Sequence, residues 1–378
     1  MKYGHLERIN VTLRTLSPLF IGSGERYTKK EYIFDANKRE IYFPNLPKFI
    51  AFLKKQNLLN HYENFLLQAR ERDLRNFLRK NGINPQEYSA FTEYQIDAEE
   101  AAEHPKFHEI VTFIKDAYGL PYIPGSSLKG AIRTAIAAQL IKSGNYNWAR
   151  RNIDNADNRG NSRNYLRYES NNLERRVFNQ LEHKDKNNEI IRNAVNDFMQ
   201  GIRVSDSRPL EYNNLTLVGK HERKPDGDVR LLPIFRECLK PGSEARLQIT
   251  LDKPMLNKVG ISMDTIEDAL HNFADAHYEV FEQYFQELPE DAETTAKQGV
   301  DVILGGGAGF VSKTLTYNLY NERNQALSKV TDIMKKQFPP NHGHNKNISL
   351  HKVAPHILKT TMYKGQYYQM GRCELIIE

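Results

Sequence analysis

Residues 122–138 read YIPGSSLKGAIRTAIAA and predict a helix that begins directly after a strand-like approach. Apolar residues that recur at helical spacing predict its core-facing side: Leu128, Ile132, Ala135, Ile136 and Leu140. Lys129 and Arg133 lie one turn apart on another side, and Ser126 or Ser127 is the expected N-cap. A helix start presents backbone N–H groups and the positive end of the helix dipole. We therefore expect this one, with its two cations, to bind an anion such as phosphate.

This helix start does not have the sequence of a nucleotide-binding P-loop. A Walker A loop requires Lys and then Ser or Thr after its last glycine, whereas Gly130 is followed by Ala131 and Ile132. An ordinary solvated helix start remains the alternative interpretation. If phosphate is the ligand, a polynucleotide is its expected carrier.

The composition is that of a globular protein with a moderately basic surface. The chain has 378 residues, 39% of them hydrophobic, which is enough for one large domain or two smaller ones. Lys and Arg number 53 against 47 Asp and Glu, which favours an anionic partner. Cys238 and Cys373 stand far apart without a CxxC pattern, so we expect neither a zinc knuckle nor a disulfide framework. With no signal-peptide or membrane-spanning run, the expected location is the cytoplasm and no membrane partner is expected.

The N-terminal half alternates strand-like and helical patterns. Residues 9–20 read as a half-buried strand that leads into a flexible turn, Gly22-Ser23-Gly24, followed by Arg26. Residues 32–34 and 40–43 read as a hairpin. Two charged segments, about 46–105 and 145–199, read as helical insertions. The second is dense in Asn with scattered apolar residues, so we expect it to be mobile.

A basic hairpin is predicted further along the chain. Residues 204–207, VSDS, end a strand in a polar turn, where Asp206 is expected to act as a cap or turn residue. Residues 215–218 and 229–235 then flank a tip with several cations: Lys220, Arg223, Lys224 and Arg230. A solvated edge protected by charge is the default interpretation of this tip.

A glycine run forms the second candidate site. Gly305, Gly306, Gly307 and Gly309 follow a predicted strand at 300–304 and precede Lys313. Glycines adopt positive φ without strain and let the backbone approach a sugar-phosphate chain closely. A tight structural turn is the alternative.

Several of these stretches together resemble the RAMP superfamily of type III CRISPR interference complexes. The pieces are IGSGE, YIPGSSLKGAIRTA, VSDS, FRECLKPGSEARLQI and ILGGGAGFVSKT, and they occur in the family's order over nearly the whole chain. FRECLKPG followed by the glycine loop is similar to one subgroup, the crRNA-end-capping subunit of the type III-A Csm complex.

The resemblance implies an α+β fold with a ferredoxin-like or RRM-like core, formed as one RAMP unit by residues of about 1–45, 106–144, 200–260 and 296–378. It also implies a non-catalytic subunit that binds near the crRNA 3′ end and supports its maturation by recruiting nucleases, and it favours contact of the basic hairpin with guide RNA or the neighbouring subunit over a solvated edge. The implied partners are crRNA, the adjacent RAMP backbone subunit, the small helical subunit and cellular exonucleases. The RNA-binding residues expected on this basis are Gly22, Ser23, Gly24, Arg26, Ser126, Ser127, Lys129, Arg133, Lys220, Arg223, Gly305, Gly306, Gly307, Gly309 and Lys313.

Two alternative functions stay open at this point. One is a RAMP endoribonuclease with His5, His104 or His108 as general base, and the other is the terminal RAMP subunit of a type III-B complex. Target-cleaving RAMP proteins use an aspartate in the loop after the first strand, but here the first aspartate, Asp35, arrives only in the next hairpin. We therefore expect no catalytic activity, no cofactor and no metal ion.

Overall fold

The core of the protein is a ferredoxin-like sheet with two helices, formed by segments far apart in the sequence. The computed structural model describes residues 4–68, 73–104, 109–156, 165–191, 193–292 and 299–378. The sheet order is β14-β1-β10-β7, antiparallel throughout, with β11 added beside β14. The elements follow one another as β-α-β-β-α-β: β1 Leu6–Thr15, α4 Gly125–Ser143, β7 Ile202–Val204, β10 Glu244–Asp252, α8 Met263–Val280 and β14 Arg372–Ile377, with β11 at Val302–Ile303. The predicted fold class is thereby confirmed.

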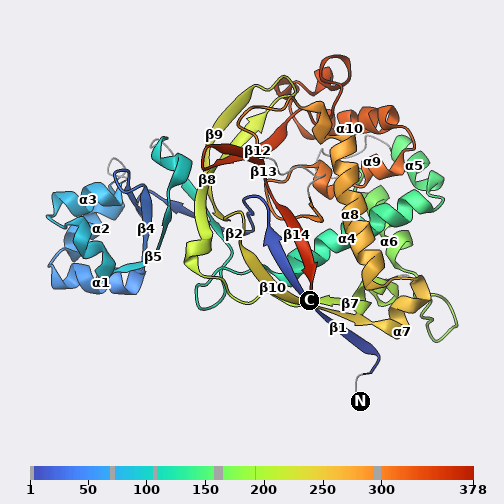
Figure 1. The fold of residues 1–378 in the computed structure, drawn as a ribbon, viewed down its shortest axis with the longest axis horizontal. Helices are drawn as coiled ribbons and strands as arrows, with labels where there is room; N and C mark the ends of the chain where they lie inside the picture. The colour runs from blue at the N-terminus through green and yellow to red at the C-terminus, as the bar shows by residue number, and fades with distance from the viewer. Residues whose placement is uncertain (1–3, 69–72, 105–108, 157–164, 192, 293–298) are drawn as a thin grey trace.

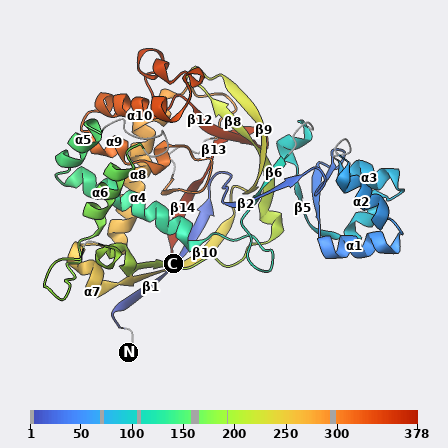
Figure 2. The ribbon, with the colours of Figure 1, turned by 180° about the vertical axis from the view of Figure 1, so that it is seen from behind.

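Helices α4 and α8 pack against each other and lie beside this sheet (Figures 1 and 2). The predicted core-facing residues of α4 are buried, except that Leu140 lies half-buried. Ala137, Ala138 and Ile141 are buried as well, because neighbouring helices cover this helix on a second side. The start of α8 is fixed by the Ser262 hydroxyl, which accepts a hydrogen bond from the Thr265 N–H.

A second sheet carries the rest of the β structure. Its order is β2-β6-β9-β8-β5-β4-β3, with β12 on the outer part of β8 and β13 on β12. The strands are β2 Gly22–Thr28, β3 Ile33–Asp35, β4 Glu40–Pro44, β5 Thr92–Asp97, β6 Glu109–Phe113, β8 Leu215–Arg223, β9 Val229–Leu239, β12 Leu358–Tyr363 and β13 Gln366–Gln369. The stretch expected to be a flexible turn, Gly22-Ser23-Gly24, is therefore the beginning of a bulged edge strand.

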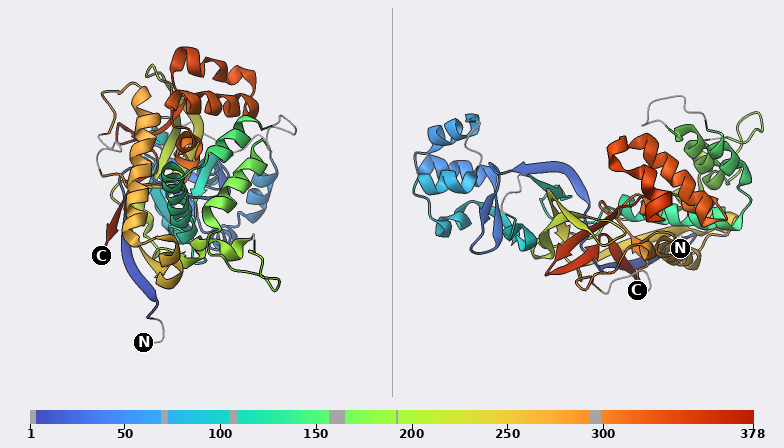
Figure 3. Two further views of the ribbon diagram at one scale, coloured as in Figure 1. Left: turned by 90° about the vertical axis from the view of Figure 1, so that its right-hand side faces the viewer. Right: turned by 90° about the horizontal axis from the view of Figure 1, so that it is seen from above.

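The first insertion forms a small lobe that stands apart from the body, as the view from above shows (Figure 3). Its helices are α1 Leu46–Lys55, α2 Leu59–Leu67 and α3 Leu74–Lys80. It has a hydrophobic core of its own, formed by Ile33, Tyr42, Phe49, Leu53, Tyr62, Phe65, Leu74, Phe77, Leu78, Ile83, Tyr88 and Phe91. The predicted insertion is helical in large part, and it also contains β5, which we did not predict.

The second insertion contains the helices α5 Asn147–Asp154 and α6 Arg167–Phe178. Leu173, Val177 and Phe178 join the main hydrophobic core, so these helices pack onto the body rather than hang from it. Further helices complete the same side of the molecule: α7 Lys253–Leu256, α9 Thr316–Leu319 and α10 Arg323–Gln337. Within the described residues, no helix combines the length and the apolar character that crossing a bilayer requires.

A stack of histidines near α10 predicts a loss of stability in acid. The ring of His356 packs against those of His344 and His351, at centroid distances of 4.9 and 4.8 Å. Burial, with the neighbouring histidines, lowers the pKa of His356 to about 4, and burial also lowers the pKa of His344 and His351. The unfolded chain binds these protons near pH 6.5, whereas the folded chain binds them only at lower pH. We expect urea midpoints to fall as the pH drops from 6.5 toward 4, and His356→Asn to flatten that dependence. An equal slope in the variant would contradict this assignment.

Candidate nucleic-acid interface

The glycine loop is held rigidly against the segment that links β1 to β2. Gly305, Gly307 and Gly309 have φ values of +79°, +88° and +90°, so the predicted positive φ is confirmed. The Gly306 N–H donates to the Phe20 carbonyl oxygen at 2.7 Å. A Cβ at Gly305 would lie 2.3 Å from the same oxygen. Glycine is thus required here by both the backbone conformation and the close approach.

Arg236 on strand β9 lies next to this loop, and Lys220 on strand β8 lies near Arg236. Arg236 is half-buried, its guanidinium lies 5.0 Å from the centre of the Phe20 ring, and its Nη1 lies 3.6 Å from the Met370 sulfur. A Cβ on Gly307 would come within 2.6 Å of that same Nη1. Lys220 is half-buried within the electrostatic influence of Arg236 and Lys359. The sequence analysis predicted Lys220 and missed Arg236.

Neither Lys220 nor Arg236 has a carboxylate within 4 Å among the described residues. Partial burial, together with Lys359 and Arg236, lowers the pKa of Lys220 even though Glu222 acts in the opposite direction, and burial lowers the pKa of Arg236. Lys359 differs because it pairs with Glu222. A half-buried cation without a counter-ion is electrostatically unfavourable and gains free energy when an anion arrives. Lys313, on the short turn after the loop, is exposed. Together these residues, Lys220, Arg236, Lys313 and Gly305–Gly309, form what we call the glycine-loop site.

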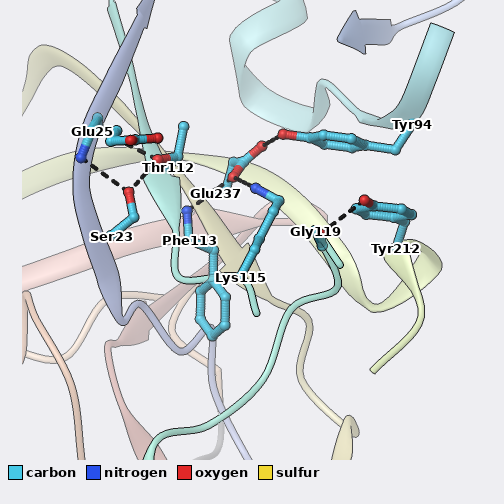
Figure 4. A network of polar contacts seen from close by, with 9 residues as sticks. All are labelled: Ser23, Glu25, Tyr94, Thr112, Phe113, Lys115, Gly119, Tyr212 and Glu237. Carbon is cyan, nitrogen blue, oxygen red and sulfur yellow. Dashed lines mark hydrogen bonds and ion pairs between the residues drawn. The ribbon is translucent and has the colours of Figure 1, made fainter. Parts of the chain in front are cut away.

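The predicted residues of the first loop lie on the exposed edge of β2 and are held by side-chain contacts (Figure 4). Ser23 Oγ lies 2.5 Å from Thr112 Oγ1 and accepts a hydrogen bond from the Glu25 N–H. Gly24 has a φ of +92° and open space around it. Arg26 pairs with Glu109 at 2.8 Å on the surface. These contacts fix the bulge that separates Gly22 from Arg26 in the pairing of β2 with β6.

A buried carboxylate lies behind this edge and joins the small lobe to the body. Glu237 on β9 is fully buried and accepts hydrogen bonds from the Tyr94 hydroxyl at 2.5 Å, the Phe113 N–H at 2.9 Å and the Lys115 ammonium at 2.7 Å. Figure 4 shows these donors converging on the carboxylate from β5 and from β6 with its following loop. The Tyr94 ring in turn stacks on that of Tyr212, with centroids 4.4 Å apart. The network therefore sets how the lobe and the β2–β6 edge meet β9.

The start of α4 differs from the prediction. Neither Ser126 nor Ser127 caps it, because the helix begins at Gly125 with Pro124 before it. The cap comes instead from Asp206, whose Oδ1 accepts a hydrogen bond from the Gly125 N–H at 2.8 Å. The expectation that Asp206 is a capping residue is confirmed. Its carboxylate provides the negative charge that the helix dipole favours, where we had expected a phosphate.

The two cations of α4 have different surroundings. Arg133 is engaged inside the protein: it bonds Asp197 at 2.8 Å and lies 3.6 Å above the Phe178 ring. Its side chain therefore ties α4 to the second insertion. Lys129 is half-buried, and this burial lowers the pKa of its ammonium. It is the α4 cation that remains without a carboxylate within 4 Å among the described residues.

Arg223 is not part of a basic tip, which corrects the sequence prediction. It is 4% exposed, pairs with Asp291 and faces the Tyr367 ring. Lys224, next to it, is exposed and pairs with Asp228 at 2.6 Å. The hairpin formed by β8 and β9 thus contributes Lys220 and Arg236 to the glycine-loop site, whereas Arg223 and Lys224 nearer its tip are paired within the protein.

The residues predicted to act together lie in two places. The helix start is beside β7 at one edge of the ferredoxin-like sheet, and the glycine loop follows β11 at the opposite edge. Of the candidate general bases, His5 is exposed, and His104 lies 3.8 Å from Glu100, while His108 lies outside the described residues. Across the part of the chain that the structure describes, no three His, Cys, Asp or Glu side chains form a group that could hold a metal ion.

Comparison with known proteins agrees with this architecture. A chain in the cryo-EM structure of a Csm–crRNA–target RNA ternary complex of a type III-A CRISPR-Cas system superposes with a TM-score of 0.66 at 19% identity, covering 98% of this chain and 100% of the other. The crystal structure of T. onnurineus Csm5 gives 0.63 at 20% identity, with 97% and 99% covered. At these identities the likeness establishes the fold.

Sequence comparison establishes the family. The model of the RAMP superfamily matches residues 12–312. The CRISPR protein Csm5 of Streptococcus thermophilus is 31% identical over 315 residues, 81% of this chain and 79% of that protein. Csm5 of Mycobacterium tuberculosis (strain CDC 1551 / Oshkosh) is 28% identical over 400 residues, 99% and 98% of the two chains. The chain therefore belongs to the RAMP superfamily and, within it, to the Csm5 family of CRISPR proteins.

Proposed function

We propose that this chain is the subunit of a type III-A Csm complex that caps the crRNA end and binds RNA near the crRNA 3′ end through the glycine-loop site. Membership in the Csm5 family favours a type III-A complex over the type III-B alternative. A structural neighbour comes from a complex that contains crRNA and target RNA, which supports RNA as the polynucleotide. Cytoplasmic location is part of the same proposal.

The observation that carries this proposal is the pair of half-buried cations, Lys220 and Arg236, near the loop formed by residues 305–309. Every residue of this loop is a glycine except Ala308. Phosphate oxygens would supply the anion that these cations lack, and the bare backbone would admit the ribose chain. Such contacts carry no base specificity. This suits a subunit that must accept guides of different sequence.

The proposed role is non-catalytic. Target-cleaving RAMP proteins have an aspartate in the loop after the first strand; here the corresponding stretch runs into β2 with Ser23 and Glu25, and the Ser23 hydroxyl is already bonded to Thr112 and the Glu25 N–H. Asp35 is 4% exposed and pairs with Arg75 in the small lobe. We propose that maturation of the crRNA 3′ end depends on recruited exonucleases. The backbone subunit and the small helical subunit are the proposed protein neighbours.

A double substitution tests the RNA-binding surface. Lys220→Gln with Arg236→Gln is expected to weaken binding of single-stranded RNA about 10- to 100-fold, because each side chain loses a charge-assisted phosphate contact. The slope of log affinity against log salt should fall by about 1.4, or 0.7 for each contact. Fluorescence anisotropy over a salt series measures both values. Lys224→Gln is the matched control, since that lysine lies on the same hairpin but pairs with Asp228, and it should leave the slope within about 0.3 of wild type. Equal slopes for all three proteins would place the RNA elsewhere.

The cellular role is tested by sequencing crRNA from purified complexes. With the wild-type chain we expect uniform 5′ ends and shortened, stepped 3′ ends. With the double variant we expect longer 3′ ends at an unchanged 5′ end. Cleavage of guide precursor by the purified chain, abolished by His104→Ala, would instead support the endoribonuclease alternative.

A further inference from the structure

A cavity of about 610 Å³ lies where the chain leaves the glycine-loop site. Val311 and Thr314, within five residues of Gly309, form one wall. The last turn of α4, the last turns of α8 and helix α9 form the others. A volume of this size is typical of sites for small organic groups. The wall of the cavity is therefore adjacent along the chain to Lys313 and the glycine loop.

The cavity presents flat ring surfaces whose polar groups are already satisfied. The Tyr317 hydroxyl donates to the Ala354 carbonyl at 2.6 Å, and the Tyr320 hydroxyl donates to Asp154 at 2.5 Å. Tyr146 and Phe273 add further rings to the lining. Rings held in this way contribute stacking faces, which bind nucleobases of any sequence.

The polar groups that remain free in this cavity are mostly hydrogen-bond acceptors or neutral amides. His277 is buried with its Nδ1 on Glu282 Oε1, so the imidazole donates there, while its Nε2 is enclosed by protein atoms and has no partner among the described residues. Burial lowers the pKa of His277, which keeps it neutral. Asn318 lines the cavity with an amide for which the described residues provide no partner.

The electrostatics of the cavity oppose those of the glycine-loop site. Helix α4 ends here at Ser143, so its last carbonyl groups and the negative end of its dipole point to the cavity. Helix α8 ends beside it at Val280, with Glu279 on the wall. Lys142 is the one cation among the lining residues in the described chain. Hydroxyl and amino donors fit these surroundings, whereas a phosphate does not.

We propose that this cavity receives the 3′-terminal nucleoside of the bound RNA, with its 2′- and 3′-hydroxyls free. The base stacks on the tyrosine rings, and the ribose hydroxyls donate to the Asn318 amide oxygen and to carbonyl oxygens at the end of α4. The strand ends here because the next phosphate would enter a site that disfavours negative charge. This inference rests on the proposed RNA-binding function and adds a preference for a 3′-hydroxyl end over a 3′-phosphate end.

The test compares two RNA oligonucleotides of one sequence, ending in a 3′-hydroxyl or a 3′-phosphate, bound to the purified full chain. We expect the 3′-phosphate to weaken binding about tenfold, equivalent to one unfavourable polar contact. Ala276→Phe fills the cavity without deleting a polar group and should abolish the difference while leaving the salt slope unchanged. Asn318→Lys should shrink or reverse the difference, because it adds a cation to the wall.

The outcomes separate this inference from the proposed function. If wild type binds both oligonucleotides equally, with a salt slope that Lys220→Gln and Arg236→Gln reduce, the RNA-binding function stands and the terminal-nucleoside site is wrong. If the full chain binds neither oligonucleotide, both are wrong. Discrimination that persists unchanged in a well-folded Ala276→Phe variant would place the recognition of the RNA end elsewhere on the protein.

Discussion

Lys115→Met is expected to lower the free energy of unfolding by about 3–5 kcal/mol, the range for removal of one partner from a buried ion pair. The substitution keeps the length and apolar character of the side chain, so the volume at the site changes little. It leaves the carboxylate of Glu237 fully buried with only the Tyr94 hydroxyl and the Phe113 N–H as donors. A buried charge without its counter-ion is far less stable than a neutral group in the same place.

A double-mutant cycle separates the ion pair from simple loss of packing. Glu237→Gln removes the charge, keeps a carbonyl oxygen for the Phe113 N–H and places an NH2 group that can donate to the Tyr94 hydroxyl, so the pair Lys115→Met and Glu237→Gln should recover much of the stability lost in the single Lys115 variant. Chemical denaturation of the four proteins gives the coupling. Additive losses in the double variant would mean that Lys115 acts through packing alone.

The network around Glu237 also helps to attach the small lobe to the body. Tyr94 comes from β5, Phe113 ends β6, and Lys115 follows it, yet all three donate to one carboxylate on β9. The helices of the lobe have their own hydrophobic core, while Phe43, Tyr94 and Ile96 of the strands that carry it belong to the main core, so this junction adds to a shared core in attaching the lobe. Variants that weaken the junction should therefore affect assembly with neighbouring subunits before they affect the folding of the lobe.

The sequence predicted the parts of the fold that depend on local spacing. The apolar spacing around Leu128 and Ile132 placed α4, and these residues are buried. The strand order β14-β1-β10-β7 could not come from periodicity, because its members are separated by up to hundreds of residues. That part of the prediction came from the resemblance to the RAMP superfamily.

The predictions for the helix cap and for two of the cations failed for one physical reason, which is that these residues pair with residues distant in the sequence. The cap of α4 is Asp206, 81 residues beyond Gly125, and a serine at the helix start was the natural local candidate. Arg133 and Arg223 were expected to face RNA, but Asp197 and Asp291 bind them inside the protein. A cation counts as available only once its carboxylate neighbours are known, and a single sequence does not reveal these.

Arg236 was missed for the opposite reason. It lies inside the FRECLKPG stretch that supported the family resemblance, within strand β9. The alternation of apolar and polar residues along a strand does not show which of its polar residues binds a ligand. Its place in the glycine-loop site depends on its neighbours, Phe20 and Gly307, which are both distant from it in the sequence. The remaining predicted RNA contacts stay predictions until RNA binding is measured.

Gly305→Val is expected to destabilise the protein by about 2–6 kcal/mol, the sum of backbone strain and steric overlap. A β-branched residue is strained at a φ of +79°, and its Cβ would lie 2.3 Å from the Phe20 carbonyl oxygen, an atom of the backbone that cannot rotate away. The loop must then leave Phe20 and lose the hydrogen bond from the Gly306 N–H. Thermal and urea denaturation of the purified chain measure the effect.

Gly309→Val is the matched control for folding, and it also tests whether the loop binds RNA. Its φ of +90° imposes similar strain, but the nearest atom to an added Cβ is Lys359 Cγ at 4.0 Å, so we expect a smaller loss of about 1–3 kcal/mol and a folded protein. If RNA lies against the loop, this variant should bind RNA more weakly and leave crRNA 3′ ends longer, although the fold survives. Normal RNA affinity and normal crRNA lengths in a folded Gly309→Val protein would show that the loop only connects β11 to the turn at Lys313. Because the two glycines share their backbone conformation and differ in what surrounds them, the comparison distinguishes a loop that is required for folding from one that is required for binding RNA.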